Sequence, residues 1–164
     1  MRHTSLVTIL LFFAGLGIGF FARGAMSPLH QGYTHAANLA AIEKLHQIDV
    51  EFTRSQDYSR LMDIWSEDAV RFMPGSPPDV GKQAILADNE KFAAEHPGFK
   101  VLSYAAKYKN LQVEDGLACE WGEHESQFKM SLEAPPVSWH GTGFHVLKRQ
   151  SDGSWKFAAM ILNQ

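Results

Sequence analysis

The sequence predicts an α+β domain in which three N-terminal helices pack on a curved antiparallel sheet. Apolar residues recur at helical spacing in the first half of the body, whereas long stretches rich in aromatic and β-branched residues fill the second half. The last two stretches are joined at Asp152-Gly153, which is a strong hairpin signal. Helices followed by long strands can cover only one face of the sheet. We therefore expect the strands to curl into a cupped sheet that holds a pocket.

The composition narrows the class of protein. A chain of 164 residues is expected to form one domain with a substantial core. The net charge of −3 is small, and the basic residues do not cluster on one face, so no nucleic-acid partner is expected. A single cysteine, Cys119, excludes an internal disulfide. Its position in a strand-like stretch predicts a buried, unreactive thiol.

The N-terminus predicts export. A long apolar stretch over residues 6–22 follows the basic residue Arg2, which is typical of a signal peptide spanning residues 1–24. The stretch is also nearly long enough for a retained single-pass anchor, which is the alternative. In both cases Arg2 favours an exported body, either periplasmic or secreted, or held at the membrane by this segment. Residues 25–36 lack periodicity and are predicted to form a linker, and the domain is expected over residues 37–164.

The first helix carries the most informative polar residue. Its predicted apolar stripe consists of Leu39, Ile42, Leu45 and Phe52, and Thr34 or Asn38 can cap its start. Asp49 fills a gap in this stripe, four residues after Leu45 and three before Phe52. Its carboxyl group is therefore expected to point toward the core or a cavity.

The remaining elements follow in order. Asp57 is expected to cap a short helix whose apolar face extends to Trp65, and a Pro-rich turn over residues 74–78 must separate the next strand from the third helix. The expected elements after that short helix are a strand at 69–73, a helix at 82–95, strands at 99–113 and 117–130, and the closing hairpin from residue 137.

Several phrases resemble the nuclear transport factor 2-like superfamily, in its SnoaL-like and ketosteroid-isomerase-like branch. They are Asp57-Tyr58 with Trp65-Ser66-Glu67-Asp68-Ala69-Val70, then Gly81-Lys82-Gln83-Ala84-Ile85, and Ser151-Asp152-Gly153-Ser154-Trp155-Lys156 before the last strand. The resemblance covers about residues 38–164. It implies a cone made of a bent sheet closed by helices. Members of this superfamily include isomerases, cyclases, dehydratases, transport factors and oligomerisation modules, so the fold does not specify an activity.

The catalytic residues of ketosteroid isomerases mostly do not match this sequence. That family's general base is a carboxylate directly before a proline on the first strand, whereas Met73 precedes Pro74 here. A thioether cannot accept a proton near neutral pH, so that chemistry is disfavoured. Counted from the matching phrases, Asp49 stands where the family has the tyrosine of its oxyanion hole, and His145 stands where it has a protonated aspartate.

Asp49 and His145 are the predicted catalytic pair. A carboxyl group and an imidazole that share a dry cavity form an acid/base pair that can be tuned near neutral pH. The alternative is a structural pair, because a buried carboxylate needs a partner in either case.

Alternation along the strand from Trp139 divides its residues between two faces, and the resemblance implies that the face with Trp139 and His145 is turned toward the pocket. The expected ligand-binding wall consists of Tyr58, Trp65, Met73, Trp121, Trp139, Met160 and Leu162, although aromatic residues on sheets are often plain core. The opposite face is expected to be apolar through Phe144, Val146, Phe157 and Ile161, which predicts a homodimer surface.

No metal and no cofactor is expected. His140 and His145 are five residues apart on one strand, so they point to opposite faces and cannot share an ion. The leading functional prediction is a domain that binds a small lipophilic molecule, such as a polyketide-like or steroid-like compound. One alternative is a proton-transfer enzyme of the isomerase, cyclase or dehydratase type that uses Asp49 and His145. The other is a non-catalytic dimerisation or assembly module.

Overall fold

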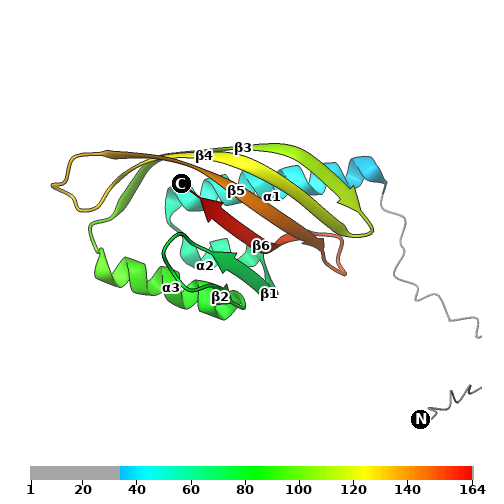
Figure 1. Ribbon diagram of the computed structural model, residues 1–164, viewed down its shortest axis with the longest axis horizontal. Helices are drawn as coiled ribbons and strands as arrows, with labels where there is room; N and C mark the ends of the chain where they lie inside the picture. The colour runs from blue at the N-terminus through cyan, green and yellow to red at the C-terminus, as the bar shows by residue number, and fades with distance from the viewer. Residues whose placement is uncertain (1–33, 164) are drawn as a thin grey trace, which may run out of the picture. The chain divides into compact units, whose positions relative to one another are not determined.

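The computed structural model describes residues 34–163, so the predicted export segment and most of the predicted linker lie outside the described residues. The elements are α1 (His35–Ser55), α2 (Tyr58–Leu61), a 3-10 turn η1 (Met62–Ile64), β1 (Trp65–Phe72), β2 (Asp79–Val80), α3 (Lys82–Glu95), β3 (Lys100–Glu114), β4 (Leu117–Lys129), β5 (Val137–Arg149) and β6 (Trp155–Asn163) (Figure 1). This order confirms the predicted α+β class. Among these residues no helix is both long and apolar enough to cross a bilayer.

The six strands form one curved sheet in the order β2-β1-β6-β5-β4-β3. Strands β3 to β6 are joined by consecutive antiparallel pairings, as predicted. Strand β1 runs parallel to β6, so the sheet is mixed rather than wholly antiparallel. Helix α1 lies behind strands β3 to β6, and α3 lies beside β1 and β2 (Figure 1). The interior is therefore enclosed between α1 and one face of the sheet.

Helix α1 turns its apolar stripe and Asp49 inward. Thr34 caps the helix, because its Oγ1 accepts a hydrogen bond from the Ala37 amide at 3.2 Å. The buried residues of the helix are Ile42, Leu45, His46, Asp49 and Phe52, which confirms the predicted orientation of Asp49. Leu39, at the outer end of the predicted stripe, is 38% exposed. His46 takes a buried position instead.

The short second helix ends earlier than predicted. Asp57 caps it as expected, with its Oδ1 accepting from the Arg60 amide at 3.4 Å. Trp65, expected on the apolar face of this helix, instead begins β1. There it pairs with Phe157 of β6, and the two rings lie 5.5 Å apart between centroids. Burial of Trp65 between the helices and the last strand outweighs the local helical pattern.

A bulge in β6 reverses the predicted orientation of Phe157. Leu147 pairs with Phe157 but its neighbour Val146 pairs with Ala159, so Ala158 is the extra residue. Phe157, expected on the outer face by strict alternation, is therefore fully buried in the core. Along β5 the alternation holds, because Gly141, Gly143, His145 and Leu147 are all buried.

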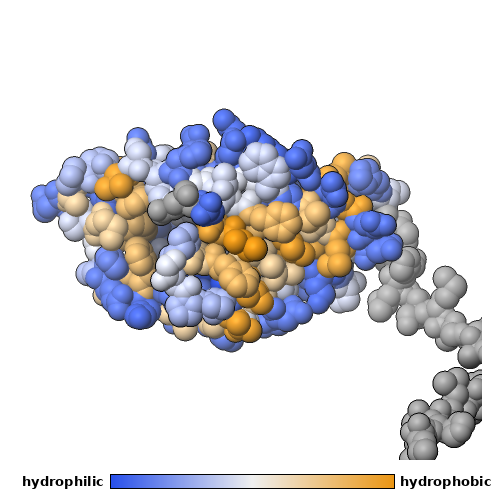
Figure 2. Space-filling model, viewed as in Figure 1, coloured by the Kyte–Doolittle hydropathy of each residue, from blue (hydrophilic) through white to orange (hydrophobic). Residues whose placement is uncertain are grey.

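The outer face of the sheet carries an exposed apolar row. The exposed side chains of Phe72, Ile161 and Phe144 and the half-buried Trp121 stand in cross-strand register on four neighbouring strands. Figure 2 shows hydrophobic residues gathered on this face, over β1, β5 and β6.

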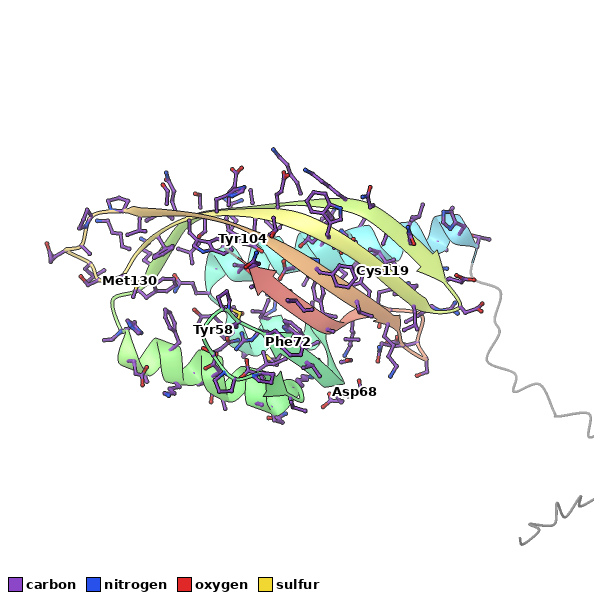
Figure 3. The ribbon with its side chains drawn as sticks, viewed as in Figure 1. Tyr58, Asp68, Phe72, Tyr104, Cys119 and Met130 are labelled. Atoms are coloured by element: carbon purple, nitrogen blue, oxygen red, sulfur yellow. The ribbon has the colours of Figure 1, made fainter. Side chains whose placement is uncertain are left out.

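Phe72 and Cys119, both labelled in Figure 3, come from β1 and β4, and the Cys119 thiol is only partly buried. The predicted homodimer through this face stays a prediction.

The bulge can be tested by two Phe→Ala substitutions. Phe157→Ala is expected to lower the free energy of unfolding by about 3–5 kcal/mol, because it opens a cavity in the core. Phe144→Ala is the matched control on the adjacent strand, where the ring is 46% exposed, and its effect should be less than half as large. Urea unfolding at submicromolar protein concentration, where association contributes little, measures both. Equal effects would contradict the bulged register.

Candidate active site

A cavity of about 200 Å³ lies between α1 and the inner face of the sheet. Its wall is mostly apolar, with polar groups from α1, β1, α3, β3 and β4. The lining residues are Asp49, Thr53, Leu61, Trp65, Arg71, Met73, Asn89, Tyr104, His124, Trp139, Met160 and Leu162. An apolar wall with a few convergent polar groups is the usual form of a small-molecule site.

Asp49 is a buried ionisable group on this wall. Its side chain is buried, and its Oδ2 accepts a hydrogen bond from the Tyr108 hydroxyl at 3.0 Å. Burial raises the pKa of the Asp49 carboxyl, although Tyr108 and the imidazoles of His145 and His46 act in the opposite direction. A carboxyl group whose pKa is moved toward neutrality is suited to exchanging a proton.

Tyr104 and His124 lie beside Asp49 on the cavity wall. The Tyr104 hydroxyl and Nδ1 of His124 are 2.9 Å apart, and Tyr104, labelled in Figure 3, also interacts with Asp49. Burial, together with the nearby His145, lowers the pKa of His124 to about 4, so its imidazole is neutral at neutral pH. Burial and the Asp49 charge raise the pKa of Tyr104, which therefore keeps its proton. These two groups can donate or accept hydrogen bonds without carrying charge.

A second group of polar residues lies behind this wall. Nε2 of His46 is 2.7 Å from Oε1 of Glu120, and Nδ1 of His145 lies 3.7 Å from the same oxygen, beyond hydrogen-bond length. Burial acts to raise the pKa of Glu120, but His145 and His46 outweigh it and hold that pKa below its usual range. The His46 ring stacks on Tyr108, with centroids 3.6 Å apart. Glu120 and His46 thus support the tyrosine that holds Asp49.

Glycines on the inner face make room for the imidazoles. A Cβ on residue 143 would lie 2.7 Å from Nε2 of His145 and 2.8 Å from Nε2 of His124. Both nitrogens are buried and have no hydrogen-bond partner among the described residues. Gly143 is paired with Gly122 on β4, so the backbone is bare where the two rings meet. Gly143 is therefore required by space and not by backbone conformation.

The predicted site residues are only partly brought together. Trp65, Met73, Trp139, Met160 and Leu162 line the cavity, as does Asp49. Tyr58 is the first residue of α2 and does not line the cavity. Trp121 lies on the outer face, with the Lys109 ammonium 4.7 Å from its ring centroid. It sits one residue from the buried Glu120, so alternation turns it away from the pocket.

His145 is on the same side of the sheet as Asp49 but not on the cavity wall. It is fully buried between Tyr108 and Phe157, whose ring centroids lie 5.7 and 5.5 Å from its own. Tyr108 therefore contacts both members of the predicted pair, which do not bond to each other. The catalytic role of Asp49 and His145 stays a prediction, and the imidazole that lines the cavity is that of His124.

The sequence pattern contains a signal for three buried polar residues that were not predicted as site residues, Glu120, His124 and His46. Glu120, Gly122 and His124 are spaced by two on β4 and share its buried face. Polar residues also occupy the other face of β4, at Glu123 and Glu125. Alternation alone therefore does not show which of the two faces is buried. His46 precedes Asp49 by three residues on α1, which is the spacing of one helix face.

A larger groove of about 830 Å³ runs along the outside of α1 against β3. Its lining includes the charged side chains of Glu43, Glu51 and Arg54, and it reaches His46 and Tyr108 but not Asp49. An open groove with charged side chains on its wall is less suited to holding a small apolar molecule than the mostly apolar cavity. The cavity beside Asp49 is therefore the better candidate.

The fold is shared with proteins of known structure. A ketosteroid isomerase-like protein from Erwinia carotovora atroseptica is 18% identical and superposes with a TM-score of 0.66 over 76% of this chain and 94% of that one. A conserved protein from Planctomyces limnophilus is 19% identical, with a TM-score of 0.68 over 78% and 98%. A suggested dehydratase of the nuclear transport factor 2-like family from Streptomyces avermitilis is 15% identical, with a TM-score of 0.63 over 79% and 96%.

These comparisons define the fold of the domain. No model of a known family matches the sequence, and no curated protein matches it. The domain has the nuclear transport factor 2-like fold, which confirms the resemblance read from the sequence at the level of architecture. At these sequence identities the structural similarity does not indicate a shared activity.

The space made by Gly143 can be tested by adding one methyl group. Gly143→Ala is expected to destabilise the domain by about 1–3 kcal/mol, because the new Cβ overlaps both imidazoles. Gly122→Ala is the matched control on the paired strand, since its nearest contact would be 3.3 Å, and it should cost clearly less. Thermal unfolding followed by circular dichroism measures both. A harmless Gly143→Ala would contradict the packing of the two histidines.

Proposed function

We propose that the domain binds a small, largely apolar molecule in the cavity and transfers a proton on it, with Asp49 as the group that exchanges the proton. The supporting observation is the position of Asp49. Its carboxyl group is buried on the cavity wall with a raised pKa, next to two neutral hydrogen-bonding groups, Tyr104 and His124. This is the arrangement that isomerase-type and dehydratase-type chemistry requires.

The proposed chemistry begins with ionised Asp49. The carboxylate takes a proton from a carbon next to a carbonyl group of the ligand, and the Tyr104 hydroxyl donates a hydrogen bond to the oxygen on which negative charge develops. His124 holds that hydroxyl through Nδ1. Asp49 then returns the proton to a different carbon, which gives isomerisation, or to a leaving hydroxyl group, which gives dehydration with release of water. Both outcomes use the same proton and need no cofactor.

The same cavity could serve a binding protein without turnover. Such a protein needs the apolar wall formed by Trp65, Trp139 and Met160 but has no need for a buried carboxyl group. Burial of Asp49 costs stability, since it disfavours the ionised form. A group kept at such a cost on a cavity wall favours the enzyme over the binder.

The volume favours a ligand of about one ring. An apolar cavity of about 150 Å³ accommodates benzene, whereas sites for drug-sized molecules begin at about 300 Å³. A cavity of about 200 Å³ therefore fits one ring with a few substituents better than a polycyclic steroid-like or polyketide-like molecule.

Deuterium exchange tests the proposal without knowledge of the natural substrate. A panel of one-ring ketones is incubated with the protein in D2O, and loss of the hydrogens next to the carbonyl group is followed by proton NMR. We expect enzyme-dependent exchange for at least one ketone. Asp49→Asn should slow it by about 10²–10⁴-fold, because an amide cannot take up the proton.

Glu123→Gln is the matched control, since it removes an outer-face carboxylate that is paired with Lys109, and it should leave exchange unchanged. Ketones that bind in the cavity without any exchange would overturn the catalytic part of the proposal and leave a binding protein. Exchange that persists in Asp49→Asn would remove Asp49 from its role.

A further inference from the structure

Arg71 is the one positively charged side chain among the described residues that line the cavity. It projects inward from β1, and its side chain is only 10% exposed. A guanidinium group on a mostly apolar wall would normally recognise a carboxylate or phosphate, because its N–H groups match two oxygens at once. Its position suggests an anion-binding cavity.

The hydrogen bonds of Arg71 contradict that reading. Its Nε and Nη2 contact Oδ2 of Asp79 at 2.9 and 2.8 Å, and Nη2 also contacts Oδ2 of Asp88 at 2.6 Å. Its Nη1 donates to Oδ1 of Asn89 at 2.8 Å. All three nitrogens therefore have partners inside the protein. The guanidinium has five N–H groups, and these contacts use four of them. An incoming anion could therefore reach one N–H of Nη1 but could not form a two-point contact without displacing a partner.

The charges around the cavity are also unfavourable for an anion. Two carboxylates, those of Asp79 and Asp88, face one guanidinium, and Asp49 adds a third acidic group on the cavity wall. His124 supplies no compensating charge, because its pKa of about 4 keeps the ring neutral. A carboxylate placed in this cavity would meet uncompensated negative charge at low dielectric.

We infer that the cavity selects an uncharged one-ring molecule with a hydroxyl or carbonyl oxygen, and that Asp79 and Asp88 determine this selectivity by occupying Arg71. The oxygen faces Asp49, Tyr104 and His124, and the ring lies against Trp65 and Trp139. This inference rests on the proposed function, since it names the class of ligand for the same cavity. It adds a specificity element from β2 and α3 that is distinct from the proton-transfer groups.

A pair of isosteric probes tests the inference. Benzamide and benzoate have nearly the same shape, but only benzoate is charged at pH 7. Binding to the full chain is measured by protein and ligand NMR titration. The wild-type protein should bind benzamide at least about tenfold more tightly than benzoate, because the anion meets unpaired negative charge.

The Asp88→Asn variant tests the inference by a gain of benzoate binding. Asp88 is 53% exposed in its side chain, so its replacement should be tolerated. Removal of its charge should raise benzoate affinity by about tenfold and leave benzamide affinity unchanged. Asp63→Asn makes the same chemical change at an exposed aspartate that does not line the cavity, and it should alter neither affinity.

The outcomes separate this inference from the proposed function. Equal or tighter wild-type binding of benzoate in the cavity would overturn the inference and leave the proposed ligand binding intact. Failure of both probes to perturb cavity residues would overturn ligand binding at this site and the inference with it. The wild-type comparison decides the inference even if Asp88→Asn does not fold.

Discussion

The burial of one carboxyl group inside a curved sheet is the constraint around which this domain is arranged. Asp49 projects from the C-terminal half of α1 into the space that the strands enclose, where an ionised carboxylate is unfavourable unless it is hydrogen-bonded. The Tyr108 hydroxyl supplies that bond from β3, across 59 positions of the chain. Helix and sheet must therefore hold a fixed relative position, and the bond joins the two layers at their centre.

The residues around this contact hold Tyr108 in position beside Asp49. Tyr108 is held by the stacked ring of His46, which in turn bonds to Glu120 on β4. Imidazoles from β4 and β5 fit against the sheet only because Gly143 leaves the backbone bare. The polar groups occupy one part of the interior, and the apolar residues of β1, β5 and β6 complete the cavity wall. A fully apolar interior would be simpler to stabilise, and the proposed function gives a reason for the polar groups.

Much of this arrangement could be predicted from the sequence, because periodicity reports which way a side chain points. The gap in the helical stripe identified Asp49, and the hairpin at Asp152-Gly153 fixed the last two strands. The orientation of Phe157 could not be predicted, since a single-residue bulge leaves no clear local pattern. The partners of Arg71 were also missed. Asp88 lies 17 positions away on another element, and such contacts depend on how the elements pack.

The central claim is that Asp49 is buried with a pKa above that of an ordinary aspartate, and carbon-13 NMR titration of its carboxyl group tests this most directly. An aspartate in an unfolded chain titrates near about 3.9. Because the folded state binds the proton more tightly, the free energy of unfolding should fall as pH rises from that value through the pKa of the folded protein. Asp49→Asn should assign the signal and abolish this decline. A folded-state pKa at or below the ordinary value would contradict the account.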